Sequence, residues 1–278
     1  MQPFGLIGPQ PDIAKQKNLY AVCLRRPIVP VRRGKFLQSH LKVMRGQDTM
    51  LSDTNQPELV ALRRAVILDG LAFVRRWERG VSTDELATRI GTALKLGNAT
   101  AAHQIVPKRT DTPNTYSGMY GFGDFPLHTD MAHWRDPPRY MMLRCVRGHA
   151  SVATMVLDGR KLIDELGEAV LARSLVKPRR PIRGAFHLLS LYRAARSGTE
   201  PLLRWDEAFI VPASPAGVMG TQLVRSVLGQ IEPTHFSLAD PGDTLILDNW
   251  RMLHGRSAVT AIEANRIIER AYMGHLYE

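Results

Sequence analysis

The sequence predicts an α+β domain with a mainly β core, a β-sandwich or barrel, on the basis of three observations. Before residue 100, apolar residues recur at helical spacing in 56–70 and 82–97. From about residue 100 onward, short apolar runs alternate with glycine and proline turns, as strands do. One helical stretch, 159–175, interrupts those strands. This order favours a β core with flanking helices.

The N-terminal part of the chain differs in composition from the rest. Residues 1–55 are rich in Pro, Gly, Arg and Lys, and contain only short β-type runs, LYAVCL and PIVPV. We therefore expect residues 1–55 to form an N-terminal extension packed on the core, and residues 56–278 to form a single domain.

Start and stop signals define the helices that precede the β core. The stretch 56–70 ends at a glycine, and the run LAFVRRW (71–77) that follows it predicts a strand. In 82–97, Ser82 or Thr83 can cap a second helix, which has an acidic first turn and a glycine at its end. Helix, strand and helix are therefore expected in this order.

The β core itself is predicted from apolar runs bounded by turn residues. These runs are YMMLRCV (140–146), ASVATMVLD (150–158), FIVPA (209–213), DTLILDN (243–249) and RIIERAYMGHLY (266–277). Periodicity alone does not decide between a sandwich and a barrel, because both bury one face of each strand.

The overall composition is that of a globular protein. Of 278 residues, 44% are hydrophobic and 23% are charged. The longest apolar runs are shorter than a membrane span, and the N-terminus lacks the pattern of a secretory signal. The chain has two cysteines, Cys23 and Cys145, which do not form a disulfide framework or a metal-binding motif. We expect a cytoplasmic protein without a membrane segment. The sequence leaves open whether the protein forms a homo-oligomer.

The strong positive charge raises nucleic-acid binding as a hypothesis. The formal net charge is +11 and the sequence pI is about 10.0. The basic residues nevertheless come in short clusters, without an RNP-like, helix-turn-helix or zinc-finger pattern. We therefore favour a role in solubility and in attracting an anionic small-molecule substrate over a nucleic-acid partner. A solvated basic surface without any partner is the simplest alternative.

The most informative motif is PLHTDMAHWRDPP (126–138), in which His128 stands two residues before Asp130. In an extended strand, residues i and i+2 point to the same face, so an imidazole and a carboxylate would lie side by side. This arrangement is half of a metal site. Taken alone the motif is weak, because such tripeptides arise by chance. His133 is a rival ligand or a polar residue of the loop.

A third ligand is found in DTLILDNWRMLHGRSAV (243–259), where His254 follows an apolar strand and a polar turn. Two histidines and one carboxylate on one face of an octahedral ion form the facial triad of non-haem Fe(II) oxygenases. Three protein ligands fix the iron, and three positions remain open for a bidentate co-substrate and O2. His128, Asp130 and His254 are therefore candidate metal ligands and catalytic residues.

A 2-oxoacid co-substrate would require a buried cation for its distal carboxylate, and arginine fits best. In a terminal strand, Arg266 and Arg270 share a face, whereas Ile267 and Glu269 face away. Thr154 is a strand-borne hydroxyl that could assist. Both arginines and Thr154 are thus candidate cofactor-binding residues, although Arg266 could equally contact substrate or cap the strand.

These motifs resemble those of the Fe(II)/2-oxoglutarate-dependent oxygenases of the taurine dioxygenase and clavaminate synthase-like group. The matching pieces are HTD (128–130), DNWRMLHGR (248–256) and RIIERA (266–271), and the resemblance spans roughly residues 57–275. It implies a double-stranded β-helix (jelly roll) with flanking helices, with residues 56–278 as the oxygenase domain. It also implies the ligand set above and Arg270 as the salt-bridge partner of 2-oxoglutarate. Thr154 matches the family's 2-oxoglutarate hydroxyl, although HASVA replaces the usual Gly-Gly-Asp before it.

The resemblance implies a dioxygenase that uses Fe(II), 2-oxoglutarate and O2, hydroxylates an unactivated C–H bond, and releases succinate and CO2. Because Asp130 is a carboxylate, hydroxylation, or a related desaturation or ring closure, is favoured over halogenation, which uses a small residue there. The favoured substrate is small and anionic, an amino acid or an acylated amino acid. The alternatives are a sulfonate, a natural-product intermediate or nucleic acid as substrate, or a non-catalytic metal-binding jelly roll.

Four further residues are candidates for contact with substrate. Tyr116, Tyr120 and Phe122 precede the expected iron ligands and either line the substrate pocket or pack in the core. Arg204 lies where related chains place an arginine that anchors substrate or tethers a strand.

Overall fold

The computed structural model describes residues 57–96, 101–112 and 114–277. The expected N-terminal extension, 1–55, lies outside these residues. Within the described part, each helix is too short or too polar to cross a membrane.

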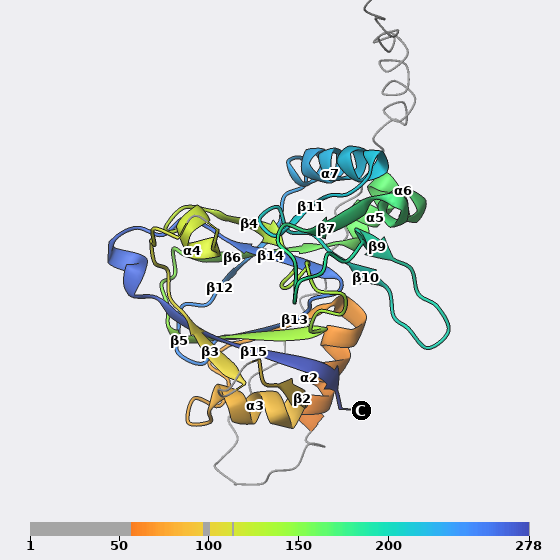
Figure 1. The fold of residues 1–278 in the computed structure, drawn as a ribbon. Coiled ribbons are helices and arrows are strands. Elements are labelled where there is room, and N and C mark those ends of the chain that lie inside the picture. Colours follow the sequence, from red (N-terminus) through yellow and green to blue (C-terminus); the bar gives the residue numbers. More distant parts are fainter. Residues whose placement is uncertain (1–56, 97–100, 113, 278) are drawn as a thin grey trace, which may run out of the picture. The chain divides into compact units, whose positions relative to one another are not determined.

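A large antiparallel sheet forms one layer of the described domain (Figure 1). Its strands run in the order β1-β13-β5-β15-β2, and β3 also pairs with β15. Their bounds are β1 (Leu71–Val74), β2 (Gly91–Leu94), β3 (Ala102–Ile105), β5 (Tyr140–Arg147), β13 (Thr244–Asp248) and β15 (Ile267–Leu276). Strands that are far apart in sequence pair with one another, as a jelly roll requires.

A smaller antiparallel sheet forms the second layer and faces the first (Figure 1). Its order is β12-β6-β14-β4, with β4 (Phe125–His128), β6 (Ala153–Asp158), β12 (Thr234–Ser237) and β14 (Met252–Arg256). One apolar cluster joins the layers, because Leu143 and Leu245 of the large sheet pack with Val156 and Met252 of the small one. This two-layer arrangement is the expected α+β jelly roll.

Helices cover the outer face of the large sheet. α2 (Pro57–Asp69) and α3 (Thr83–Ile90) bury their apolar sides against Ala271 and Met273 of β15. Since side chains alternate along a strand, Arg270 and Tyr272 point to the opposite, interior face. The helices thus fix which face of β15 is turned toward the space between the sheets.

A further layer of helices and short strands adjoins the small sheet. It contains α5 (Arg160–Leu166), α6 (Glu168–Arg173), α7 (Pro215–Leu228), β7 (Leu175–Pro178), β8 (Leu189–Ser190), β9 (Tyr192–Arg193), β10 (Leu202–Leu203) and β11 (Ile210–Pro212). Its own core contacts the small sheet through Leu157 and Leu253. Two short elements remain, α4 (Tyr116–Met119) and the 3₁₀ helix η1 (Ile262–Asn265).

Only the first half of the helix expected over 82–97 is helical in the structure. Ser82 caps α3 by accepting a hydrogen bond from the Glu85 amide, but the helix ends at Ile90. β2 begins at Gly91, where an added Cβ would lie 2.0 Å from the His275 carbonyl oxygen of β15. A glycine is needed here because the two backbones approach closely.

The expected helical insert, 159–175, is also interrupted. It forms α5 and α6, which are separated by Gly167 at φ 81, a left-handed value that favours glycine. The helix α7 was not expected from the sequence. Its buried face is formed largely by small residues, Gly217, Gly220 and Thr221, so the apolar spacing that reveals a helix is weak.

Candidate metal centre

Three buried side chains converge at the pairing of β4 with β14. His128 ends β4 and lies directly opposite His254 in the β4–β14 register, so their ring centroids are 4.3 Å apart. Asp130 Oδ1 lies 3.3 Å from His128 Nε2 and 3.8 Å from His254 Nε2. One ligand atom from each residue lies within 4.8 Å of the others. The structure therefore brings together the three residues that the sequence motifs selected.

The position of Asp130 differs in detail from that expectation. β4 ends at His128, and Asp130 lies in the turn that follows, not in the strand. The next residue, Met131, has a φ of 56°, a left-handed value that is uncommon for a side chain of its size. The turn, and not strand alternation, directs the carboxylate toward the imidazoles.

The two oxygens of the Asp130 carboxylate have different surroundings. Oδ2 accepts hydrogen bonds from Arg270 at 3.0 Å and from the Tyr272 hydroxyl at 2.6 Å. Burial opposes ionisation, but Arg270 and the two histidines hold the pKa of Asp130 well below its usual range. The carboxylate is therefore ionised, and Oδ1 is the oxygen that faces the imidazoles.

The histidines are oriented for coordination through Nε2. His128 Nδ1 lies 2.9 Å from the Pro126 carbonyl oxygen, so Nδ1 carries a proton and Nε2 faces Asp130. Burial, with His128 close by, lowers the pKa of His254 to about 3, so this imidazole is neutral. Burial opposes protonation of His128, but contact with Asp130 raises its pKa, so a metal ion must compete with a proton there. Neutral imidazoles and an ionised carboxylate are the forms that bind a divalent metal. The donor set fits the facial triad of a non-haem iron site.

A second buried polar group lies between the sheets. Arg266 immediately precedes β15 and is 5% exposed, and its guanidinium lies 3.4 Å from the Thr154 hydroxyl of β6. Burial lowers the pKa of Arg266 to about 10, so it remains charged at neutral pH. Among the described residues, no carboxylate forms an ion pair with Arg266, and its Nε lacks a partner.

The aromatic candidates occupy different positions. The Tyr116 ring of α4 lies 5.5 Å from the His128 ring, and its hydroxyl donates to Asp206. Tyr120 packs against Phe125 at 4.9 Å, and Phe122 is exposed. Of the three, only Tyr116 directly adjoins a candidate metal ligand.

Asp206 was not selected from the sequence. It is 1% exposed, and its Oδ1 accepts the backbone amides of Ala208 and Phe209. Within the described part of the chain, no cation pairs with it. An Asp in a turn carries no sequence signal for such a role, because its position depends on the contact with α4.

Arg204 holds the loop that follows Asp130. Its guanidinium is buried and donates to the carbonyl oxygens of Ala132, Trp134 and Arg135, at 2.9, 2.5 and 3.2 Å respectively. Burial lowers the pKa of Arg204 to about 10, so it stays charged at neutral pH. All these contacts are to backbone, which favours loop tethering over substrate anchoring.

We expect Arg204→Met to destabilise the protein by about 3 kcal/mol, because it leaves three carbonyl groups without their donor at about 1 kcal/mol or more each. Urea denaturation of the apo-protein measures this change. Arg196→Met, at an exposed position, is the matched control. An unchanged midpoint for Arg204→Met would show that the loop does not depend on this arginine.

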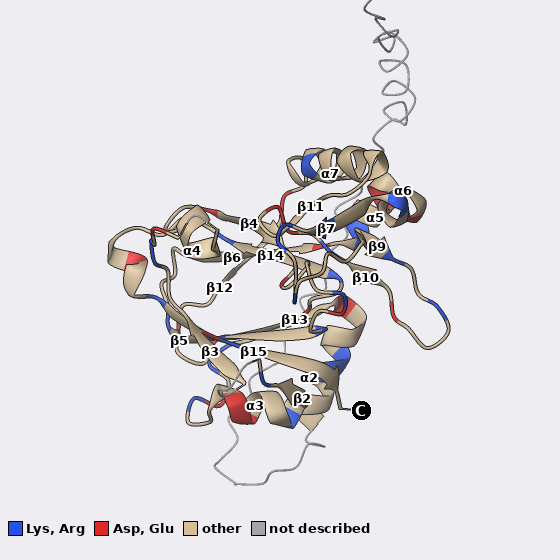
Figure 2. Cartoon of the chain, in the orientation of Figure 1, with Lys and Arg blue, Asp and Glu red and all other residues tan. Residues whose placement is uncertain are grey.

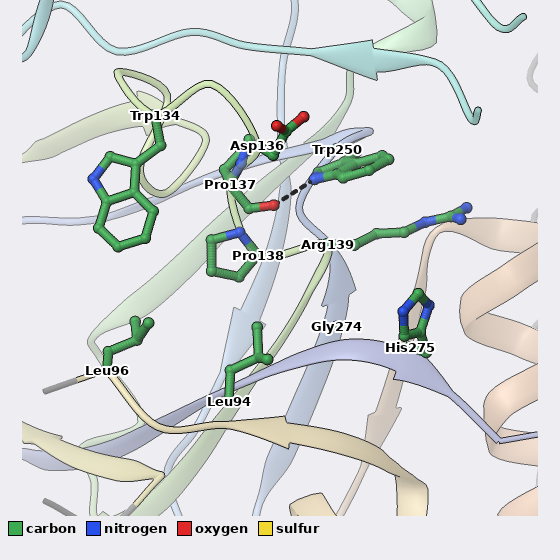
Figure 3. Close-up of a pocket in the computed structure, with 10 residues that line it drawn as sticks. All are labelled: Leu94, Leu96, Trp134, Asp136, Pro137, Pro138, Arg139, Trp250, Gly274 and His275. Carbon is green, nitrogen blue, oxygen red and sulfur yellow. Dashed lines mark hydrogen bonds between the residues drawn. The ribbon is translucent and has the colours of Figure 1, made fainter. Parts of the chain in front are cut away.

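A separate surface hollow of about 250 Å³ lies outside the metal centre (Figure 3). It is lined by Leu94, Leu96, Trp134, Asp136, Pro137, Pro138, Arg139, Trp250, Gly274 and His275. None of the three candidate ligands lines it. The loop 131–138 links the two places, since it follows Asp130 and contributes to the wall of the hollow.

Basic side chains are distributed over the elements of the described domain. In the view of Figure 2, Lys and Arg are interspersed with Asp and Glu on helices, strands and loops.

No protein-family profile matches the chain. Solved structures do resemble it. Asparagine oxygenase, in complex with Fe(II), 3-hydroxyasparagine and succinate, is 19% identical, with a TM-score of 0.59 over 78% of this chain and 77% of that one. PvcB from Pseudomonas aeruginosa is 16% identical, with a TM-score of 0.58 over 79% of this chain and 81% of its own.

The oxygenase OrfP, in complex with Fe, succinate and (3S)-hydroxy-L-Arg, is 18% identical, with a TM-score of 0.55 over 78% of this chain and 79% of that one. PvcB is described as an Fe, α-ketoglutarate-dependent oxygenase from an isonitrile synthetic pathway. At these identities, the comparisons show a shared fold. The jelly roll implied by the sequence motifs is confirmed.

Proposed function

We propose that this protein is an Fe(II)- and 2-oxoglutarate-dependent oxygenase that hydroxylates a small substrate. The observation that carries the proposal is the buried convergence of His128, Asp130 and His254 inside a jelly roll of the oxygenase type. A metal-binding protein without catalysis would need the same three ligands. It would not need the buried Arg266–Thr154 pair in the same interior.

The ligands for iron are His128 Nε2, His254 Nε2 and Asp130 Oδ1, which face one another. Iron bound there with 2-oxoglutarate supplies the activation of O2 that hydroxylates a C–H bond and yields succinate and CO2. Arg270 and Tyr272 hold the remaining oxygen of Asp130, so the carboxylate is oriented to offer a single oxygen to the metal.

The two arginines differ in a way that separates their roles. Arg266 is almost fully buried beside the Thr154 hydroxyl and lacks an anionic partner among the described residues. A dicarboxylate co-substrate supplies that anion, so we assign its distal carboxylate to Arg266 and Thr154. The family resemblance implied Arg270 for this role, whereas the sequence itself left both arginines as candidates.

Arg270 is better suited to the substrate. It already donates to Asp130, and its side chain is 26% exposed, so it reaches space that solvent can enter. An anionic group on a substrate beside the metal would meet this cation. The basic composition of the chain is consistent with attraction of such a substrate.

Asp206 favours a positively charged group on the substrate, whereas Arg270 favours a negatively charged one. A buried carboxylate without a cation costs free energy. Asp206 accepts a hydrogen bond from the hydroxyl of Tyr116, whose ring lies against His128. A substrate ammonium or guanidinium group would supply the missing charge. Arg270 and Asp206 together favour a free amino acid over an acylated one or a sulfonate. Asparagine oxygenase and OrfP, whose structures hold hydroxylated amino acids, have the same fold.

An anaerobic titration tests the proposal. Fe(II) and then 2-oxoglutarate are added to the apo-protein, and we expect a weak absorption band at about 500 nm from the chelate at the open coordination sites. A panel of amino acids, acylated amino acids and sulfonates is then screened for succinate release. His235→Ala, at an exposed histidine outside the candidate ligand set, is the control and should retain the band.

The outcomes separate the hypotheses. Absence of the band in the wild-type protein would reject the oxygenase proposal. Metal binding without the band would favour a metal-binding jelly roll. A band together with succinate release only on acylated amino acids or sulfonates would retain the chemistry and reject the role given to Asp206.

A further inference from the structure

We propose that Asn249 is a positioning residue that sets the geometry of the metal centre by clamping the backbone of Asp130. The inference rests on the proposed metal site. Asn249 is not one of the three candidate ligands. Its side chain contacts backbone atoms of Asp130 and of the loop that follows.

The Asn249 carboxamide is fully engaged with the loop that carries Asp130. Asn249 is 1% exposed and lies in the turn between β13 and β14. Its Oδ1 accepts the Asp130 amide at 2.7 Å, and its Nδ2 donates to the Asp130 carbonyl oxygen at 3.0 Å. Nδ2 also donates to the Pro138 carbonyl oxygen at 2.9 Å. One side chain thus binds both backbone polar groups of a metal ligand.

Asn249 binds the backbone next to a residue with an uncommon conformation. The residue after Asp130, Met131, has a left-handed backbone with a φ of 56°, which bulky residues seldom adopt without surrounding constraints. Asn249 holds the loop at Asp130 and again at Pro138, where it rejoins β5. Without the clamp, the turn could relax, and the carboxylate direction would change with it.

A neighbouring residue holds the same loop without touching Asp130. The Trp250 indole N–H donates to the Pro137 carbonyl oxygen at 2.9 Å, as Figure 3 shows. Trp250 and Asn249 are consecutive, and the same turn leads into β14 and His254. The turn therefore leads into the strand that carries one candidate ligand and clamps the backbone of another, which links the two halves of the metal centre.

The hydrogen-bond pattern requires an amide. Aspartate has almost the same shape, but it cannot donate, and its carboxylate would face the carbonyl oxygens of Asp130 and Pro138. Asn249→Asp therefore converts two attractive contacts into repulsive ones with little change in volume. Trp250→Phe is the matched comparison, because it removes one loop contact and leaves the Asp130 clamp intact.

The test uses Co(II) alone as a spectroscopic probe of the metal site. We expect Asn249→Asp to weaken Co(II) binding by about 10- to 100-fold, as removal of groups that orient metal ligands does, and to alter the d–d absorption spectrum. Trp250→Phe should bind Co(II) with an unchanged spectrum, even where its thermal unfolding midpoint falls. Asn265→Asp, at an exposed position remote from the clamp, should resemble the wild type.

The possible results are decisive. Wild-type Co(II) affinity and spectrum in folded Asn249→Asp would overturn the positioning role and leave the proposed function intact. Failure of the wild-type protein to bind Co(II) would instead reject the metal site itself. If circular dichroism shows that Asn249→Asp does not fold, Asn249→Ser removes the clamp without adding charge and is judged by the same two measurements. Equal spectral changes in Asn249 and Trp250 variants would also overturn the proposal, because they would indicate general loosening of the loop.

Discussion

Replacement of Asp130 by alanine should lower the affinity for Fe(II) by more than about 100-fold, because loss of a group that merely orients a ligand already reduces affinity 10- to 100-fold. The two remaining ligands, His128 and His254, are neutral or compete with a proton, and neither supplies negative charge. Competition with a chromophoric chelator measures this affinity. The charge-transfer band with 2-oxoglutarate should disappear as well.

The same substitution has a consequence for the apo-protein. Arg270 and Tyr272 both donate to Asp130, so Asp130→Ala leaves a cation and a buried hydroxyl without their acceptor. Because the Arg270 side chain is 26% exposed, water replaces part of the contact. We therefore expect the free energy of unfolding to fall by about 2 kcal/mol, less than the 3–5 kcal/mol lost when a fully buried ion pair is broken.

Asp164→Ala, at an exposed position on α5, is the matched control for both the Fe(II) affinity and the stability of the apo-protein. It should behave as the wild type in both. A variant Asp130→Ala that binds Fe(II) as tightly as the wild type would remove Asp130 from the ligand set. The site would then have to be sought elsewhere in the chain.

The strands and the candidate metal ligands could be selected from the sequence because their signals are local. The period-2 alternation of RIIERAYMGHLY gave the face shared by Arg266 and Arg270, and the structure has Glu269 on the opposite side, bonded to Thr83 of α3. The side-chain types His, Asp and His in their order along the chain indicated the donor set. Chemistry that depends on residue type is readable in one sequence.

Features that depend on distant segments could not be read in this way. Asn249 and Asp130 lie 119 positions apart, so their contact exists only after the sheets have paired. The end of α3 at Ile90 follows from the close approach of Gly91 to β15, which outweighs the helix-forming residues that come after it. Asp206 likewise acquires its place from α4 and from a turn.

The different roles proposed for Arg266 and Arg270 predict a second large effect, on the affinity for 2-oxoglutarate. We expect Arg266→Met to weaken 2-oxoglutarate binding by about 10- to 100-fold, since a hydrogen bond to a charged group contributes about 1.5–3 kcal/mol. The physical reason is that Arg266 is buried beside Thr154 and its charge lacks a partner among the described residues. Arg270→Met should leave 2-oxoglutarate affinity within about threefold of the wild type, because Arg270 is already committed to Asp130 and weak indirect effects are of this size.

Anaerobic titration of the Fe(II)-loaded proteins with 2-oxoglutarate, followed through the charge-transfer band, measures each affinity directly. Arg160→Met, an exposed arginine at the start of α5, is the control for removal of one positive charge. Loss of 2-oxoglutarate binding in Arg270→Met with retention in Arg266→Met would return the co-substrate to Arg270, as the family resemblance implied. The substrate anion would then have to be bound by another cation. The expected result instead leaves Arg270 available to contact the substrate, because its guanidinium contacts the candidate ligand Asp130 and its side chain is 26% exposed.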